Sequence, residues 1–360
     1  MPFEQLRDRL PVLATEAAPE DPWPRVGRGG VSFSDDLMRV GGGRLAVRIR
    51  VTDRPSGGYV IDLRDSDPPQ HDDRFRLSED QARTACVLAL GHAFGRAPTT
   101  AWASRIELLT DPTTWVGRQP TEPTEPTEPT EPIEPAALAF GMARTADALL
   151  GALANAWPGR VGAGSCSLGA VVELRPDKQG DEQTAEQTAE QVDRQILLTE
   201  VLPGGEGGRP DRAGADAWPG LILPTRWPAR WDEPASAQGV VLEGELREGS
   251  GGMGKHAGGR GVVRVYRAKR PLLARVAFDR VYNPPHGIDR AGPPAGTEAW
   301  LHLPGQARPR AVDPWQPAKL PAGARLEIRT CGGAGWGFPG YGEIEWDPSD
   351  WFGSKPKASG

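Results

Sequence analysis

The stretch GVVLEGELREGSGGMGKHAGGRGVVRVYRA, residues 239–268, places a glycine-rich connection between two alternating segments that are typical of strands. Within it GSGGMGKH, residues 249–256, matches the phosphate-loop pattern G-x-x-x-x-G-K-[ST] except at the last position, where His256 replaces the hydroxyl that binds magnesium. A phosphate loop also needs a helix after it, and the glycines of the following AGGRG would each cost a helix about 1 kcal/mol relative to alanine. We therefore expect a structural connection in which residues without a Cβ allow positive φ and close approach of backbones.

Further short strands are predicted on both sides of this stretch, each bounded by glycine or proline. They are QILLTEVL (195–202), LLARVAFDR (272–280), EAWLHLP (298–304) and ARLEIRT (324–330). Short strands with turn residues between them indicate an antiparallel sandwich or barrel, and a chain with 46 Gly and 37 Pro suits them better than long helices. The predicted fold class is α+β and strand-dominated, with an antiparallel β half at the C-terminus and a few helices packed on one side.

The N-terminal half combines a hairpin with two helices. Apolar residues alternate with arginines in RLAVRIRVT, and a Pro-Ser-Gly-Gly turn follows, which predicts a hairpin over residues 44–65. Ser78 and Gln81 form a capping box at the start of a helix predicted over 78–95. A second apolar stripe predicts a helix within RTADALLGALANAWPG, residues 144–159.

Two low-complexity stretches divide the chain. TEPTEPTEPTEP (121–132) predicts an extended, solvated linker because its prolines fix φ and remove donors, and DEQTAEQTAEQ (181–191) has no apolar face. The expected organisation is an N-terminal hairpin and helix region (1–118), a TEP-repeat linker (119–135), a helix and strand segment (136–178), a low-complexity insert (179–194), a C-terminal β region with glycine-rich turns (195–345) and a tail (346–360).

Charge and cysteine content exclude several classes of function. The net charge is -6 and the basic residues are spread along the chain, which argues against a nucleic-acid partner. Cys86, Cys166 and Cys331 lie far apart, which argues against a disulfide framework or a zinc site. The first residues lack the pattern of a secretory signal, and no stretch approaches the ~18 apolar residues of a spanning helix. We expect a cytoplasmic protein with no membrane partner.

Candidate catalytic residues follow the predicted strand LLARVAFDR. Asp279, Arg280 and His286 lie at and after its end, beside a Pro-Pro-x-Gly turn, where a loop often holds functional groups. The alternative is an ion pair between Asp279 and Arg280 that fixes the turn, with an exposed His286. His92 is expected to be packed or capping, and Cys166 has no neighbouring base in the sequence that would activate it.

Glycines and aspartates offer weaker candidates. In CGGAGWG (331–337) the alternatives are a backbone nest for an anion and tight packing under Trp336. Three aspartates in VIDLRDSDPP (60–69) resemble a hard-metal set, but the arginine between them and the prolines after them favour a turn. We expect no metal and no cofactor bound directly by this chain. The glycines expected to have structural roles are Gly251, Gly252, Gly254, Gly258, Gly259, Gly287, Gly332, Gly333, Gly335 and Gly337.

Three segments in a fixed order carry a resemblance to a known family. They are ELREGSGGMGKHAGGRGVVRVYR (245–267), FDRVYNPPHGIDRAGPPAG (278–296) and LPAGARLEIRTCGGAGWG (320–337). Together they resemble the C-terminal part of the hydantoinase B/oxoprolinase family, the subunit of ATP-dependent N-methylhydantoinase, 5-oxoprolinase and acetone or acetophenone carboxylases. Weaker agreement in VIDLRDSDPPQ and in ARTADALLGALANAWPGRVGAGSCSLGAVV extends the resemblance over roughly residues 40–340.

The resemblance implies a subunit, shortened at the N-terminus, that shapes the substrate cavity in ATP-dependent hydrolysis of a cyclic amide such as 5-oxoproline or a hydantoin. It implies that ATP and a divalent metal come from partner chains, namely a hydantoinase A-like ATP-binding subunit and a chain that supplies the N-terminal half. The alternatives are a ketone carboxylase subunit and a non-catalytic scaffold. Two departures from the family argue against catalysis by this chain alone: the five histidines are isolated, and Trp227 and Trp231 stand where the family has polar residues.

Overall fold

The structure is a computed structural model, and it describes residues 23–39, 43–69, 75–96, 98, 100–117, 134–177, 196–218, 220–222, 235–237 and 239–339. The TEP repeat, the DEQTAEQTAEQ insert, Trp227 and Trp231, and the tail from 346 lie outside the described residues. The predictions made for those segments therefore stay predictions.

The N-terminal half is built on a four-stranded sheet in the order β1-β2-β3-β4. The predicted hairpin is confirmed, because β2 and β3 pair antiparallel with Val51 opposite Ile61. In β2 the alternating apolar side chains are buried and Arg48 and Arg50 are exposed, as the period of two requires. The strands are β1 (Val31–Met38), β2 (Arg44–Asp53), β3 (Tyr59–Asp62) and β4 (Ile106–Leu109), of which β3 and β4 pair parallel.

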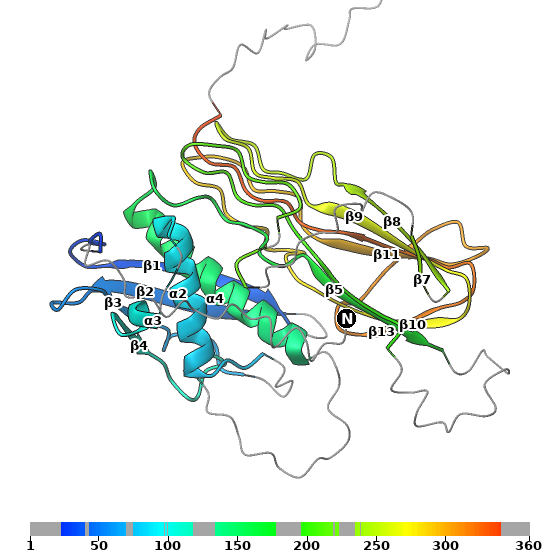
Figure 1. The fold of residues 1–360 in the computed structure, drawn as a ribbon, viewed down its shortest axis with the longest axis horizontal. Helices are drawn as coiled ribbons and strands as arrows, with labels where there is room; N and C mark the ends of the chain where they lie inside the picture. Colours follow the sequence, from blue (N-terminus) through cyan, green and yellow to red (C-terminus); the bar gives the residue numbers. More distant parts are fainter. Residues whose placement is uncertain are drawn as a thin grey trace, which may run out of the picture.

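Helices cover this sheet, as Figure 1 shows for α2 and α4. The predicted first helix is confirmed as α2 (Glu79–Phe94), with the capping box at Ser78 and a left-handed Gly95 (φ 65°) at its C-terminal end. The second helix, α4 (Glu134–Ala156), is longer than expected and begins inside the range assigned to the linker. A short α3 (Thr100–Ala103) lies between them in sequence.

α4 is a core helix. Among the described residues it is the one helix whose length and composition would suffice to cross a membrane, over Ala136–Ala156, but 94% of that window is buried inside the protein. Its neighbours are α2, β1 and β2. The apolar sequence of α4 is therefore accounted for by burial in the first core, which joins the β1–β4 sheet to both long helices.

The C-terminal half is a β-sandwich. One sheet has the order β13-β10-β5-β6 and the other has the order β12-β11-β14-β9-β8-β7, with antiparallel pairing throughout. A second core of aliphatic residues, with the buried Tyr266, fills the space between the sheets. The strands are β5 (Ala170–Pro176), β6 (Leu198–Leu202), β7 (Ala235–Ala237), β8 (Val240–Leu246), β9 (Val262–Ala268), β10 (Leu272–Phe278), β11 (Glu298–His302), β12 (Arg310–Ala311), β13 (Pro317–Leu320) and β14 (Arg325–Arg329).

The predicted α+β, strand-dominated class and the antiparallel C-terminal sandwich are confirmed. One detail differs, because the helices pack on a sheet of their own in the N-terminal half rather than on the sandwich. The difference arises because β1 and β4 were not predicted, and they complete the sheet that the helices need as a partner.

Extended glycine-rich segments link the two halves. Residues 162–169, 203–209, 250–261 and 330–337, here called the glycine array, run side by side and hydrogen bond through their backbones (Figure 1). The Gly208 amide, for example, donates to Ala334 O at 2.8 Å, and the Gly333 amide donates to Gly259 O at 2.9 Å. Ala163 and Ala334 of the array belong to the first core, whereas the residues that follow the array in β5 and β9 enter the second.

Backbone contact, more than unusual φ angles, explains the glycines of the array. A Cβ built on Gly258 or Gly333 would lie well under 3.0 Å from the carbonyl groups of Gly333 and Glu206, respectively. Within GSGGMGKHAGGRG only Gly249 has a positive φ, of 67°. The expected positive φ is thus limited to that one glycine, and the others allow neighbouring chains to approach closely.

Candidate functional site

The end of β10 enters a buried cluster of charges. Asp279 and Arg280 directly follow this strand and are 4% and 3% exposed, and Arg280 has a left-handed φ of 65°. A left-handed arginine is unusual, and this one aims its guanidinium toward β1 and α4. The strand end thus brings an acid and a base to the boundary between the two halves.

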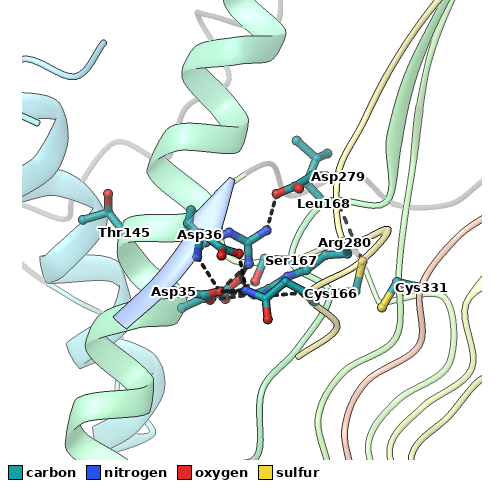
Figure 2. A network of polar contacts seen from close by, with 12 residues as sticks. Asp35, Asp36, Thr145, Cys166, Ser167, Leu168, Asp279, Arg280 and Cys331 are labelled. Atoms are coloured by element: carbon teal, nitrogen blue, oxygen red, sulfur yellow. Dashed lines mark hydrogen bonds and ion pairs between the residues drawn. The ribbon is translucent and has the colours of Figure 1, made fainter. Parts of the chain in front are cut away.

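Five residues from three elements form this cluster, which we call the buried ion network: Asp35 of β1, Arg144 and Asp147 of α4, and Asp279 and Arg280 after β10. Arg280 binds both carboxylate oxygens of Asp35 at 3.0 Å, a bidentate arrangement, and reaches Asp147 at 2.8 Å. Arg144 binds Asp279 at 2.5 Å and Asp35 at 3.2 Å. Figure 2 shows the side chains of Asp35, Asp279 and Arg280 converging from these elements.

Neutral donors complete the coordination of the carboxylates. The Ser167 hydroxyl donates to Asp147 at 2.7 Å, and the Met38 amide donates to Asp279 at 3.1 Å. The Asn283 amide group donates to Asp35 at 2.9 Å and also to Asp36. Every carboxylate of the network is therefore bound by at least one arginine and one further donor, as burial requires.

The network holds more acids than bases, and the pKa values respond to this excess. Burial raises the pKa of Asp147 to about 7 despite the attraction of Arg144. Burial likewise raises the pKa of Asp279. For Arg144 burial disfavours the charge, but attraction to Asp35, Asp279 and Asp147 outweighs it and raises the pKa. Burial thus favours the protonated form of Asp147, while attraction to three carboxylates keeps Arg144 charged.

His286 lies at the edge of the network. It is half-buried, and its ring packs on Phe33 of β1 with 4.5 Å between ring centroids. Burial lowers the pKa of His286, and the charge of Asp35 partly offsets this effect. The structure thus brings Asp279 and Arg280 into one network and places His286 next to the strand that carries Asp35.

The structural alternative for these residues needs correction. Asp279 and Arg280 do form ion pairs, but their partners lie on β1 and α4, so the pairs join distant elements instead of fixing one turn. His286 is half-buried and not exposed, because the turn folds back onto Phe33. The catalytic role of the three residues stays a prediction.

The glycine loop at 249–256 connects two strands. β9 begins six residues after its end, so the helix that would form a phosphate site does not follow. The backbone of His256 pairs with Trp336, and the Lys255 amide donates to Gly337 O at 3.0 Å, which ties the loop into the glycine array. The interpretation of this loop as a structural connection agrees with the observed elements.

The remaining candidates have packing or ion-pair partners. Asp62 binds Arg64 at 2.7 Å and Asp67 binds Arg48 at 2.6 Å, so this turn is fixed by ion pairs. The Arg209 guanidinium donates to Nε2 of His92 at 3.1 Å, and the pKa of His92 is lowered to about 4 because burial disfavours its charge. Within the described part of the chain no three His, Cys, Asp or Glu side chains are grouped so that they could hold a metal ion.

Two cysteines lie beside the network. Cys166 and Cys331 are fully buried neighbours (Figure 2), and contact with Cys331 together with burial raises the pKa of the Cys166 thiol. A thiol with a raised pKa is a poor nucleophile. The nucleophile interpretation of Cys166 therefore has no support in its surroundings.

Sequence reasoning missed Asp35, Arg144 and Asp147. A usable signal existed in α4, where Arg144 and Asp147 interrupt an otherwise apolar helix at a spacing of three residues. Charges inside a buried helix need partners. The partner of Arg144 on β1 lies 109 residues away and the partner after β10 lies 135 residues away, and no local pattern identifies them.

A family model matches most of the chain, and one relative matches part of it. The family model described as hydantoinase B/oxoprolinase matches residues 12–339. An uncharacterized protein of Methanocaldococcus jannaschii is 34% identical over 100 residues, which are 28% of this chain and 17% of that protein.

Two solved structures are similar at low identity. The crystal structure of an ATP-dependent caprolactamase from Pseudomonas jessenii has a TM-score of 0.59 at 15% identity, over 86% of this chain and 52% of that one. The nucleotide-free structure of acetone carboxylase, from work on ATP-dependent acetone carboxylation, has a TM-score of 0.61 at 13% identity, over 86% and 46%. At these identities the likeness shows the fold, and this chain spans about half the length of either structure.

Proposed function

Because the chain belongs to the hydantoinase B/oxoprolinase family, we propose that it is a subunit contributing to ATP-dependent hydrolysis of a cyclic amide. The resemblance predicted from the sequence is confirmed by the family match over residues 12–339, which is the observation that carries the proposal. The similarity to a protein named as an ATP-dependent caprolactamase supports the choice of a cyclic amide, since caprolactam is one.

The proposed chemistry activates a poor electrophile. The amide oxygen attacks the γ-phosphorus of ATP, ADP leaves, and the carbon of the resulting phosphorylated amide accepts water. The C–N bond then breaks to give the free amine and an acyl phosphate, and a second water releases phosphate and the carboxylate. ATP would be bound by a partner, a hydantoinase A-like subunit, in keeping with a loop at 249–256 that lacks the helix of a phosphate site.

This chain would supply shape and positioning. Asp279 and Arg280 are buried, so we propose that they act as positioning residues that hold β1, α4 and the end of β10 in register. His286 is the one of the three predicted residues with partial exposure, and it is our candidate for contact with substrate. Among the described residues, no three His, Cys, Asp or Glu side chains lie close enough to bind a metal ion together. In this proposal a divalent metal would be bound by a partner chain, and no reaction step is assigned to it.

A ketone carboxylase subunit is the second candidate. The likeness to acetone carboxylase favours it, at a TM-score close to that of the caprolactamase. The two reactions differ in the group that ATP activates and in the need for bicarbonate. One assay of ATP consumption can therefore distinguish them. A scaffold without catalytic activity is the third candidate, supported by the missing metal-ligating group in the described residues.

The test is substrate-dependent ATP consumption. The full chain would be co-purified with a hydantoinase A-like subunit. ADP release would be measured with 5-oxoproline, hydantoin or caprolactam, and with acetone plus bicarbonate. We expect ADP release that depends on a cyclic amide and on the presence of this chain. ADP release that depends on acetone and bicarbonate would support the carboxylase instead. ADP release that neither a substrate nor this chain changes would support a scaffold without catalytic activity.

A pair of variants tests the role of His286 in the same assay. His286→Gln should lower kcat of the complex by at least about tenfold if the ring contacts the reacting groups. His302→Gln is the matched control, because His302 is also half-buried but lies on β11 of the sandwich, where it contacts Arg325 at 3.0 Å. Equal activity of both variants would remove His286 from the site.

A further inference from the structure

A pocket of about 510 Å³ lies at the C-terminal end of α2, and none of the residues of the buried ion network line it. Five separate segments form it: residues 23–24 before β1, the end of α2 at 93–96, Trp102 of α3, residues 159–160 after α4, and residues 209–211 at the end of the second segment of the glycine array. Its volume lies within the roughly 300–1,000 Å³ of small-molecule sites, and it sits where separate layers of the fold meet, a usual place for such sites.

One wall of the pocket is aromatic. Trp23, Phe94 and Trp102 line it and pack edge to face, with ring centroids 5.5 to 5.6 Å apart. The guanidinium of Arg105 lies 4.7 Å above Trp23 and fixes this ring from outside the lining. The wall is therefore a rigid apolar surface that could stack against a flat group.

Three arginines from three segments converge on the same pocket, namely Arg96, Arg160 and Arg209, and Asp211 is the one acid that lines it. The C-terminal end of α2 contributes residues 93–96 to the lining. The lining therefore carries more cationic than anionic side chains, which favours an anionic ligand.

His92 and Glu206 fix the position of the Arg209 side chain. Its side chain is 18% exposed, and its Nη1 atom lies 3.1 Å from Nε2 of His92 and 3.6 Å from Glu206. The lowered pKa of His92 keeps that ring neutral, so the ring does not repel the arginine at neutral pH. Glu206 is shared with Arg212 at 2.8 Å, which leaves the charge of Arg209 only partly compensated. A fixed guanidinium with five N–H groups, of which these contacts use one nitrogen, is suited to an oxyanion.

From these observations we infer that the pocket binds a small molecule that carries a carboxylate or phosphate group on a flat apolar body. The oxyanion lies against Arg160 and Arg209, and the flat body stacks on the wall of Trp23 and Phe94. The planar guanidinium of arginine binds carboxylates and phosphates alike through two parallel hydrogen bonds. The pocket is therefore expected to accept either oxyanion, and the probes below distinguish the two.

Calorimetric titration of the full chain tests the inference, and it needs neither ATP nor a partner, so its result is independent of the proposed function. The probes are phenyl phosphate, benzoate and the uncharged benzyl alcohol. We expect saturable binding of at least one anionic probe in the millimolar range or tighter; phenyl phosphate alone would assign a phosphate ester and benzoate alone a carboxylate. Absence of saturation with both anions, or benzyl alcohol binding as tightly as they do, would overturn the inference.

Matched arginine variants locate the binding. Arg160→Gln should weaken binding of the anionic probe about tenfold, the loss expected for one charge-assisted contact. Arg308→Gln removes the same charge at an exposed loop position outside the pocket lining and should leave affinity unchanged. Equal weakening by both variants would mean that the anion responds to overall charge, and the pocket would be rejected as the site. Thermal unfolding of both variants checks that they fold.

Discussion

At the scale of single residues, the buried ion network ties three distant parts of the chain together through two arginines. Arg144 contacts three carboxylates and Arg280 contacts two, and both arginines are 3% exposed. A buried ion pair adds little stability compared with apolar residues of the same size, but removal of one partner leaves an uncompensated buried charge. The network therefore specifies which elements meet more than it strengthens the fold.

Arg144→Met should destabilise the protein strongly. The substitution keeps an apolar stem in α4 but removes the arginine that binds Asp279 and leaves Asp35 and Asp147 with Arg280 alone. A loss of about 3–5 kcal/mol in the free energy of unfolding is expected. Arg308→Met, at an exposed position, should change it by less than about 0.5 kcal/mol. Denaturant unfolding of both variants gives the comparison, and a loss at Arg144 no larger than at Arg308 would contradict the charge argument.

The raised pKa of Asp147 predicts a pH dependence with a definite sign. Its pKa in the folded chain is about 7 against an ordinary 3.8, so between these pH values the folded state binds a proton that the unfolded state has released. The stabilisation that Asp147 contributes is fully present below pH 3.8 and is lost as the pH rises through about 7. The burial of Asp279 and Asp36 raises their pKa values and acts in the same direction.

Asp147→Asn removes this titration. Relative to the natural protein, the variant should gain roughly 2–3 kcal/mol of stability between about pH 5 and about pH 8, at no more than about 1.4 kcal/mol per pH unit. Denaturant midpoints at the two pH values measure the change. Asp313→Asn, on the exposed loop before β13, provides the same change in charge without burial. A parallel pH dependence of the natural protein and the Asp147 variant would disprove the assignment.

At the scale of elements, local sequence patterns predicted α2 and most strands because the required signals lie within a few residues. The capping box of Ser78 and the alternation in β9 are of this kind. β1 was missed because Asp35 and Asp36 occupy its centre, where a strand pattern expects apolar residues; Asp35 faces inward and binds Arg280 instead. The start of α4 was missed because the apolar stripe was recognised only from Arg144, and because the adjoining proline repeat made residues up to 135 look like linker.

The candidate site was predictable only in part, for a physical reason. Asp279 and Arg280 follow a predicted strand, so their position at a strand end could be recognised. Their partner Asp35 lies 245 residues from Arg280 along the chain, and only the tertiary fold brings the two together. The pocket beside α2 was not predicted, because its three arginines come from three separate segments.

The glycine array makes a prediction about alanine substitutions. In Gly333→Ala the added methyl group would meet the backbone of Glu206, which cannot move without displacing two neighbouring segments of the array. A loss of more than about 3 kcal/mol, or failure to fold, is expected, above the usual range for overpacking. Gly159→Ala is the control, since a Cβ there meets nothing within 4 Å. Thermal unfolding and soluble yield compare the two, and similar behaviour of both variants would show that the array tolerates side chains.

At the scale of the whole molecule, the array joins two cores that would otherwise be separate. The first core holds the helices and the β1–β4 sheet, and the second holds the sandwich. The array has no regular strand or helix in its described residues, yet its amides are hydrogen bonded and its glycines are mostly buried. Protection against hydrogen exchange should therefore resemble that of the sheets.

Hydrogen exchange measured by mass spectrometry would test this expectation. Peptides covering 203–209 and 330–337 should exchange about as slowly as β10, because opening them requires separation of the two halves. The exposed loop at 304–309 should exchange orders of magnitude faster and serves as the reference. Fast exchange in the array peptides would show that the halves open independently.

The make-up of the array also bears on how the chain is assembled during synthesis. Glycine loses more backbone freedom on ordering than any other residue, and it has no apolar side chain to bury. The segments of the array therefore gain little from associating until both cores align them. Residues 330–337, which donate to or accept from each of the other three segments, leave the ribosome last among them. Until residues 330–337 are synthesised, the backbone N–H and C=O groups of the other three segments lack their partners from this last segment. We expect the nascent chain to be most prone to association with other chains during this interval.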